Sequence, residues 1–446
     1  MNAVELAAKL RERQENNRPI RVGVIGCGQM GSGLSHAIDN ITGMCVSAIA
    51  DVIVDRGIQT FERIGFERDD IRVVRSLGEA VDSIRQSKVV VTEDAVLLTA
   101  IPEIDANVEA TGVTEVGARV AYGSIMNRKP IVMLNAETDV TIGYYLNVLA
   151  RKTGALYTVA SGDEPGVLKM LYEQATLMGF KVICLGKGKN NPLNTSITPE
   201  ECVDEARSKG MNPKMLCSFI DGTKTMVEMA AVANATGLTP DVPGMHGPKV
   251  DLHDLVREFV PKADSGILSG AGRVDYSTGK IAPGVFAVVH TDDRFIQQEM
   301  KFITHWDGPY YLQFRPYHLC DLETPQSIAE AVLLNEVTVT AETTSAEVVC
   351  TAKRDLKTGE KVDGIGGADW YGVIYQFDEA RRKKAIPIGI AGGGIVKKPI
   401  RKGEILSADN FSPDTTTFVY RLRALQDSLV EFDAGRLSID AKELSI

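Results

Sequence analysis

One run near the start of the chain limits its fold more than any other: PIRVGVIGCGQMGSGLSHAI, at positions 19–38. The apolar half predicts a buried strand, and the glycines that follow it have the spacing G-x-G-x-x-G before a helix. The first glycine lets the turn close, the second lets a pyrophosphate approach the backbone, and the third lets the helix pack on the strand. The run predicts an α/β domain that binds a dinucleotide. The cofactor contacts expected in this turn are Gly26, Gly28, Gln29, Met30 and Gly31.

An acid for the adenine ribose stands at the expected distance. A second predicted strand, MCVSAIAD, ends at Asp51, twenty residues after Gly31. A carboxylate there favours NAD because it repels a 2′-phosphate, whereas Arg56 can reach such a phosphate and favours NADP. Spacing alone leaves both cofactors open. A Rossmann fold without a cofactor and an adenosyl-methionine site are the alternatives for this domain.

The alternation of strands and helices continues to about residue 155, which we take as the end of a dinucleotide-binding domain, 1–155. VVVTEDAVLLTA offers strand material, NVEATG (107–112) ends another strand, a helix follows to residue 127, and KPIVMLNAETD makes the next strand. Ends of later strands flank the nicotinamide in such folds. The candidates there are Ala110, Thr111 and Asn135. Glu137 lies at the same mouth and either contacts substrate or stabilises a helix start.

Two adjacent acids open the middle segment, 156–345. Residues 157–186 are expected to form a strand, a loop, a helix and a strand, with Asp163 and Glu164 just before the helix and Pro165 in its first turn. Capping explains one acid. Two acids at a strand exit suit a divalent cation or general acid–base chemistry.

The strand after that helix ends in CLGKGKNNPLN, positions 184–194. Lys187 and Lys189 supply positive charge, the glycines leave room for a ligand, and Asn190 adds a neutral donor. The stretch indicates either a floor that binds a phosphate or carboxylate, or a solvated surface turn.

A long amphipathic helix is predicted for SFIDGTKTMVEMAAVANATG (218–237), ending at Gly237. Asp221, Lys224 and Glu228 are spaced by three and four residues, so they are expected to share one face. That face is either an ion-pair ladder or catalytic. Further on, FRPYHLCDLETP places Arg315 and His318 beside an aromatic residue, which suits anion recognition.

The last hundred residues, 346–446, contain a repeat. AKRDLKTGEKVDG (352–364) and VKKPIRKGEILSA (396–408) are similar at an offset of 44, and each is expected to form a strand, a turn and a strand. The fold class expected is α/β: an N-terminal Rossmann domain, a central α+β domain and a C-terminal β-rich module.

Composition excludes some functions. The formal charge of −10 argues against a general nucleic-acid binder, which would carry a basic surplus. The sequence has no run of 18 apolar residues and no signal-peptide pattern in its first twenty residues, so neither a membrane span nor secretion is expected. The seven cysteines are scattered, which favours reduced thiols and a cytoplasmic location.

The order of these motifs resembles the homoserine-dehydrogenase-like oxidoreductases that carry a C-terminal SAF (β-clip) domain. The resemblance rests on GVIGCGQMG, VEATG, NAETD, SGDEPG, GKGKNN, RPYHL and KRDLKTGE, and KPIRKGEIL is similar to the SAF module. Within the group the chain resembles the 1-deoxy-D-xylulose 5-phosphate reductoisomerase-like enzymes. Asp221 and Lys224 stand three apart rather than four, and Ala136 replaces a lysine after Asn135, so true homoserine dehydrogenase activity is not expected.

The resemblance implies an NADP(H)-dependent reductoisomerase, homodimeric, acting on a small phosphorylated or carboxylated substrate, with NAD as the other possible cofactor. An NAD(P)-dependent dehydrogenase of another small aldehyde or hydroxy acid, and a nucleotide-sensing protein without turnover, stay open. The implied catalytic residues are Lys187, Lys189, Asp221, Lys224, Asp163 and Glu164. The implied substrate-binding residues are Asn190, Arg315, His318 and Glu137. The implied Mg²⁺ or Mn²⁺ ligands are Asp163, Glu164 and Glu228.

Overall fold

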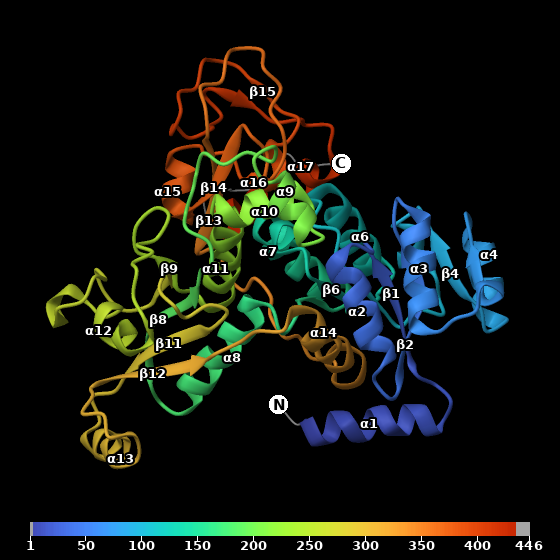
Figure 1. The fold of residues 1–446 in the computed structure, drawn as a ribbon, viewed down its shortest axis with the longest axis horizontal. Helices are drawn as coiled ribbons and strands as arrows, with labels where there is room; N and C mark the ends of the chain where they lie inside the picture. Colours follow the sequence, from blue (N-terminus) through green and yellow to red (C-terminus); the bar gives the residue numbers. More distant parts are fainter. Residues whose placement is uncertain (1–2, 434–446) are drawn as a thin grey trace, which may run out of the picture.

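The computed structural model describes residues 3–433. Its N-terminal part is a seven-stranded sheet of order β3-β4-β2-β1-β5-β6-β7, and every pairing in it is parallel (Figure 1). The strand order reverses at β1, which pairs with β2 on one side and β5 on the other, so a ligand crevice is expected at the carboxyl end of β1. The strands are β1 Ile20–Ile25, β2 Met44–Ala50, β3 Ile71–Val73, β4 Val89–Thr92, β5 Ala106–Glu109, β6 Ile131–Met133 and β7 Tyr157–Val159.

Helices cover both faces of this sheet because its strands are apolar on both faces. Val22 and Val24 of β1 belong to one core, whereas Ile25 belongs to the other. The expected α/β class is confirmed, although the strand material expected in VVVTEDAVLLTA stops at Thr92. The helices are α1 Ala3–Glu15, α2 Gln29–Asp39, α3 Val54–Ile64, α4 Leu77–Arg85, α5 Leu97–Ala100, α6 Thr114–Met126 and α7 Ala136–Thr153, with a 3-10 turn at Arg68–Asp70.

The central part is a five-stranded mixed sheet of order β12-β11-β8-β10-β9. β10 runs parallel to β8 and β9, whereas β11 runs antiparallel to β8 and β12. The strands are β8 Lys181–Gly188, β9 Thr239–Pro240, β10 Arg273–Ser277, β11 Val285–His290 and β12 Tyr310–Arg315. The helices are α8 Glu164–Leu177, α9 Val203–Ser208, α10 Pro213–Ile220, α11 Thr223–Thr236, α12 Leu255–Glu258, α13 Arg294–Thr304 and α14 Cys320–Ala329, with 3-10 turns at Leu252–Asp254 and Lys262–Asp264 and a π-helical turn at Glu330–Leu334.

The single amphipathic helix expected at 218–237 is wrong. The chain turns at Gly222, whose φ of +91° suits glycine, and this turn separates α10 from α11. α11 ends at Gly237 as expected, but nearly all its residues are buried because α7, α8, β13 and β14 pack around it. A helix enclosed on all sides carries little amphipathic signal.

The C-terminal module pairs its two repeats with each other, around an antiparallel pair of longer strands. Leu356 and Ile400 exchange backbone hydrogen bonds of 2.8 and 3.0 Å. The bond from Ala352 N to Glu404 O is matched by one from Val396 N to Glu360 O, both 2.9 Å, at the same offset of 44. The module therefore has a local two-fold relation. Its elements are β13 Ala346–Ala352, β14 Trp370–Gln376, α15 Phe377–Arg382, α16 Ile388–Ala391, β15 Ile395–Val396 and β16 Phe411–Ser412.

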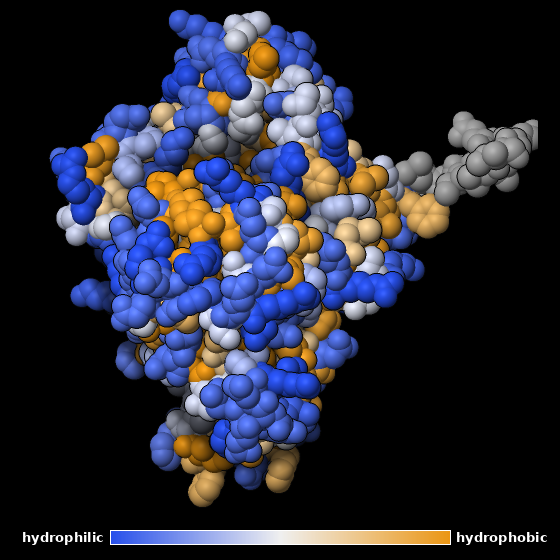
Figure 2. Space-filling model, turned by 90° about the vertical axis from the view of Figure 1, so that its right-hand side faces the viewer, coloured by the Kyte–Doolittle hydropathy of each residue, from blue (hydrophilic) through white to orange (hydrophobic). Residues whose placement is uncertain are grey.

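The sequence interpretation of this module as simply β-rich missed a helix, α17 Phe418–Asp433, which returns to pack on α6 and α7. Residues 434–446 of the expected module lie outside the described residues. Figure 2 shows the side that carries α3 and α4, mostly hydrophilic with an apolar patch in its upper half. Among residues 3–433, no helix has the length and apolar character needed to cross a bilayer.

Candidate active site

The glycine turn after β1 has the three roles that its spacing predicts. Gly26 has φ +90°, and a Cβ there would lie 2.9 Å from the backbone of Ala110. A Cβ at Gly31 would collide with the carbonyl oxygen of Gly26. A Cβ at Gly28 would meet no protein atom within 4 Å, so this glycine borders open space where a phosphate can approach. Gly28 caps α2 without a side-chain bond, and Gln29 and Met30 begin the helix.

Asp51 is fixed at the end of β2 by backbone donors. Its Oδ2 accepts a 2.7 Å bond from Cys27 N in the glycine turn, and its Oδ1 accepts a 2.8 Å bond from Ile53 N. The Arg56 Nη1 atom lies 3.9 Å from the same carboxylate, and its side chain is half-exposed. Both predicted determinants of cofactor choice therefore lie side by side at one edge of the turn.

The end of β5 forms the wall beside this turn. Glu109 is fully buried, and its Oε1 accepts bonds from Thr111 N at 2.8 Å and from the Thr111 hydroxyl. Burial raises the pKa of Glu109 to about 7, although the bonds from Thr111 oppose the rise. Asn135 caps α7 by accepting a 3.0 Å bond from Thr138 N. The sequence interpretation missed Glu109, although it stands inside the VEATG motif.

The two acids that precede α8 belong to a buried charge cluster, which we define as Asp163, Glu164, Lys187, Lys224 and Glu228. Asp163 begins the helix, but its side chain makes no capping bond, so capping does not explain it. The Lys187 ammonium lies between Glu164 and Glu228 and forms short ion pairs with both. Carboxylate oxygens of the three acids lie within 4.8 Å of one another. The structure thus brings together residues from α8, β8 and α11 that are 65 positions apart in sequence at most.

On one side, the charge cluster extends toward the end of β5 and the start of α7, which border the glycine turn. Lys224 Nζ lies 3.2 Å from Glu137 Oε1, at the start of α7. Because Asn135 and Glu137 share that helix start, the cluster and the dinucleotide turn border one region. α14, whose first residue is Cys320, packs on α2 and so connects the cluster to the dinucleotide turn (Figure 1). Glu137 therefore pairs with a cluster lysine in addition to its place in the first turn of α7.

Two further side chains meet the cluster, one from just before α14 and one from its first residue. His318 Nε2 lies 3.4 Å from Glu164 Oε1, and Cys320 Sγ donates a 3.2 Å bond to Asp163 Oδ1. The sequence interpretation named His318 but missed Cys320. A thiol two residues after a candidate histidine was the available signal.

Burial and mutual repulsion set the charges in the cluster. Burial, with the charge of Glu164 added, raises the pKa of Asp163 to about 6 and that of Glu228 to about 8. Burial would also raise the pKa of Glu164, but Lys187 and His318 outweigh it and hold that pKa far below its usual range. Burial alone would lower the pKa values of Lys187 and Lys224, yet the neighbouring carboxylates raise both well above normal. The lysines stay charged, whereas Asp163 and Glu228 exchange protons near neutral pH.

The remaining predicted substrate residues lie around the cluster without joining it. Lys189 Nζ donates a 2.7 Å bond to Phe219 O, and burial lowers the pKa of Lys189 to about 8, with help from Lys187. Asn190 is exposed one residue later. Arg315 is paired with Glu323 and lies 4.7 Å over the ring of Tyr317.

Asp221 is not on the shared face predicted with Lys224 and Glu228. It precedes the turn at Gly222, accepts a 2.8 Å bond from Thr223 N, and pairs at 2.8 Å with Lys353 of the C-terminal module. That lysine also donates to Gly367 O and Ile197 O. The predicted catalytic role of Asp221 therefore has no geometric support, because its carboxylate is turned to a different cation.

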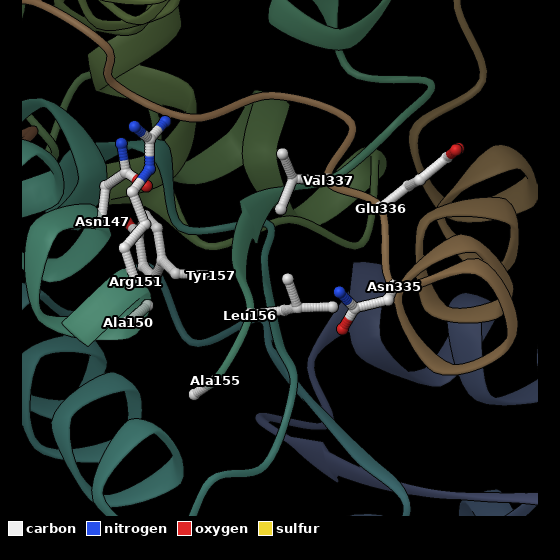
Figure 3. Close-up of a pocket in the computed structure, with 9 residues that line it drawn as sticks. All are labelled: Asn147, Ala150, Arg151, Ala155, Leu156, Tyr157, Asn335, Glu336 and Val337. Carbon is white, nitrogen blue, oxygen red and sulfur yellow. The ribbon is translucent and has the colours of Figure 1, made fainter. Parts of the chain in front are cut away.

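A cavity of about 420 Å³ lies at the opposite, amino-terminal end of β7. Figure 3 shows Asn147, Arg151 and Tyr157 on one side of it and Glu336 and Val337 on the other. Arg151 is already paired with Glu342 at 2.6 Å. None of the cluster residues lines this cavity, so the candidate active site is distinct from it.

One comparison with known proteins matches a defined segment of the chain. Residues 162–324 match the family described as oxidoreductase DRL, catalytic domain. That segment contains every member of the charge cluster, together with His318 and Cys320. No curated protein matches the sequence.

Solved structures with a similar arrangement include three oxidoreductases of low identity. A probable dehydrogenase from Thermotoga maritima is 13% identical over 71% of this chain and 90% of that one, with a TM-score of 0.41. Apo scyllo-inositol dehydrogenase from Lactobacillus casei is 13% identical over 73% and 91%, with a TM-score of 0.41. The 1-deoxy-D-xylulose 5-phosphate reductoisomerase from Zymomonas mobilis, in complex with NADPH, is 14% identical over 70% and 81%, with a TM-score of 0.38.

At these values the fold rests on the strand order itself, and the chemical class rests on the family match. The SAF and homoserine dehydrogenase resemblances find no counterpart in these comparisons. The family match supports an oxidoreductase whose catalytic segment carries the buried charge cluster.

Proposed function

We propose that the protein is an NADPH-dependent reductoisomerase that converts 1-deoxy-D-xylulose 5-phosphate to 2-C-methyl-D-erythritol 4-phosphate. The observation that carries the proposal is the charge cluster beside the dinucleotide turn. A simple hydride transfer to a carbonyl needs one proton donor. Three buried carboxylates and two buried lysines suit a reaction that also rearranges a hydroxyketone, because protons must leave and return at several oxygens.

Roles within the cluster follow from its proton affinities. General acid–base catalysis works best when the pKa lies near the working pH. Asp163, Glu228 and Lys189, with pKa values raised to about 6, raised to about 8 and lowered to about 8, meet that condition. Lys187 and Lys224 stay charged and stabilise an oxyanion that develops on the substrate.

A divalent cation fits the donor set. Asp163, Glu164 and Glu228 offer carboxylate oxygens within 4.8 Å of one another, and their mutual repulsion is what a cation would relieve. When bound, Mg²⁺ or Mn²⁺ polarises the substrate carbonyl and hydroxyl oxygens. Lys187 partly substitutes for it by neutralising Glu164 and Glu228.

Cofactor and phosphate binding complete the proposal. When bound, NADPH supplies the hydride that reduces the aldehyde. Arg56, half-exposed beside Asp51, favours the 2′-phosphate of NADPH. Lys189 is the cation left for the substrate phosphate, because the ammonium of Lys187 is already held between two carboxylates; Arg315 would bind the phosphate by exchanging its pairing with Glu323.

A second candidate is a metal-independent NAD(P)-dependent dehydrogenase of a small aldehyde or hydroxy acid. One observation favours it: Lys187 already fills the space between Glu164 and Glu228, so the cluster is partly neutralised without a cation. The two candidates share the cofactor turn and differ in metal dependence.

The deciding experiment follows NADPH oxidation with 1-deoxy-D-xylulose 5-phosphate, with and without Mg²⁺ or Mn²⁺, using aspartate semialdehyde as the control substrate. Metal-dependent oxidation with the sugar phosphate alone supports the reductoisomerase. Oxidation of NADPH by the semialdehyde alone, without added metal, supports the dehydrogenase. Tight NADPH binding with neither oxidation overturns both substrate assignments.

A further inference from the structure

A second set of metal-type ligands overlaps the charge cluster. Ligand atoms of Glu164, His318 and Cys320 all lie within 4.8 Å of one another. Glu164 begins α8, whereas His318 and Cys320 come from the segment between β12 and the start of α14. This mixed set of oxygen, nitrogen and sulfur is separate from the all-oxygen set of Asp163, Glu164 and Glu228, except that both contain Glu164.

The imidazole of His318 is oriented as in a metal-binding histidine. Its Nδ1 lies 2.8 Å from the carbonyl oxygen of Pro283, which only accepts, so Nδ1 carries a hydrogen. Nε2 is thereby aimed at Glu164 Oε1, 3.4 Å away. In the neutral ring Nε2 is an acceptor facing a carboxylate oxygen that already accepts from Lys187, so a proton or a metal cation is what Nε2 can bind there. A backbone carbonyl behind the ligating ring is the usual outer partner of such a histidine.

Cys320 completes the set from the same segment. Its Sγ lies 3.2 Å from Asp163 Oδ1, and the residue is half-buried. Lys187 Nζ donates to the same Glu164 Oε1, which fixes the position of this carboxylate. The three residues are therefore held close together by contacts with Pro283, Asp163 and Lys187.

The chemistry of the set selects the cation. Thiolate and imidazole suit Zn²⁺ and Co²⁺, whereas Mg²⁺ and Mn²⁺ prefer oxygen ligands. We propose that Glu164, His318 and Cys320 form a binding site for a borderline transition-metal cation of the Zn²⁺ or Co²⁺ class. Three protein ligands leave one tetrahedral position open. Because Glu164 belongs to both sets, such a cation competes with Mg²⁺ or Mn²⁺ for the cluster. The site does not depend on the proposed reaction.

The test uses Co²⁺ as the probe on the full chain, without NADPH or substrate. Co²⁺ bound by a thiolate shows a sulfur-to-metal charge-transfer absorption that an all-oxygen site lacks. We expect this absorption to saturate at one Co²⁺ per chain and Zn²⁺ to abolish it by displacement. Cys320→Ser should remove the absorption and weaken Co²⁺ binding by about tenfold or more.

Matched variants separate this site from its alternatives. Cys45→Ser removes another half-buried thiol, far along the chain in β2, and should keep the absorption. Glu228→Gln removes a ligand of the all-oxygen set alone and should also keep it. His318→Ala should weaken Co²⁺ binding while the thiol remains, so a folding failure of the Cys320 variant does not end the test.

Three outcomes overturn the proposal: no charge-transfer absorption in the folded wild type, an absorption that survives Cys320→Ser, or equal Co²⁺ binding with and without His318. Circular dichroism of each variant establishes that it is folded. Because the readout involves no turnover, a failed metal site and a failed reductoisomerase assignment give different results.

Discussion

Two buried lysines, Lys187 and Lys353, have opposite electrostatic surroundings. Lys353 faces one carboxylate, Asp221 at 2.8 Å, and its other donors meet the carbonyl oxygens of Ile197 and Gly367 at 2.9 and 2.7 Å. Lys187 lies between two carboxylates, and a third, Asp163, adjoins them. The charge of Lys353 is balanced by a single carboxylate, whereas Lys187 belongs to a cluster that has three acids and two lysines.

This difference distinguishes a structural ion pair from a candidate active site. A matched pair with its remaining donors satisfied by carbonyl oxygens holds two segments together, here the C-terminal module and the α10–α11 turn. An unmatched cluster keeps carboxyl groups that take up and release protons near neutral pH, which folding alone does not require. The predictions below test this contrast.

The largest effect is expected for Lys353→Met. Removing one partner of a buried pair leaves Asp221 uncompensated and should lower the free energy of unfolding by about 3–5 kcal/mol. Denaturant unfolding measures it. Lys357→Met, an exposed lysine of the same module, is the control and should change stability by less than about 0.5 kcal/mol. Equal effects of both variants would contradict the contrast.

Lys224→Ala should lower kcat by about 10²-fold or more, equivalent to about 2.7 kcal/mol, because a charged donor beside the reacting oxygens is lost. Steady-state NADPH oxidation measures it. Lys169→Ala, in α8 and paired with Glu173 outside the cluster, is the control that should retain the wild-type rate. Unchanged turnover in Lys224→Ala would show that Lys224 is not a catalytic residue.

Glu109 is a buried acid that has no ion pair among residues 3–433, so it extends the comparison to a carboxyl group that no cation balances. Its pKa is raised from 4.5 to about 7, so its contribution to folding is fully present below pH 4.5 and is lost as the pH rises through 7. Glu109→Gln is neutral at every pH. It should be more stable than the wild type by about 3 kcal/mol at pH 8, and equal to it below pH 4.5, in denaturant titrations.

Lys187→Met should cost less stability than Lys353→Met, about 1 kcal/mol at pH 6, because the acids that lose their cation can take up protons. The cost should grow between pH 6 and 8, where the carboxyl groups resist protonation. Unfolding titrations across that range measure it. A cost that equals that of Lys353→Met and does not change with pH would show that Lys187 is a purely structural cation.

The glycine turn was predictable residue by residue because its roles depend on local backbone geometry. Gly26, Gly28 and Gly31 act through a positive φ, an open approach and a close packing contact, all within six residues. The acids at 163 and 164 were predictable for a similar reason, as they follow a strand and precede a helix.

Partners from distant segments were not predictable. The spacing of Asp221 to Lys224 suggests one helical face. In the structure the turn at Gly222 separates the two residues, and Asp221 pairs instead with Lys353, which is 132 residues later in the chain. Cys320 and Glu109 stand inside the motifs FRPYHLCDLETP and VEATG, but nothing in the sequence sets them apart from their neighbours. Their roles depend on which charged groups they are buried against, and the linear sequence does not contain that information.

The two-fold pairing in the C-terminal module has an evolutionary and practical consequence. Each half offers an edge that is complementary to its own copy, since Leu356 and Ile400 occupy equivalent positions and bond to each other. Such an arrangement is what a duplicated ancestral peptide leaves behind when a homodimer of short chains becomes one covalent unit. It also means that the peptide link between the halves is dispensable for their pairing. A chain nicked in the exposed turn at Lys383 and Lys384, which lies between the repeats, should therefore keep its two halves associated, which limited proteolysis followed by size-exclusion chromatography can measure.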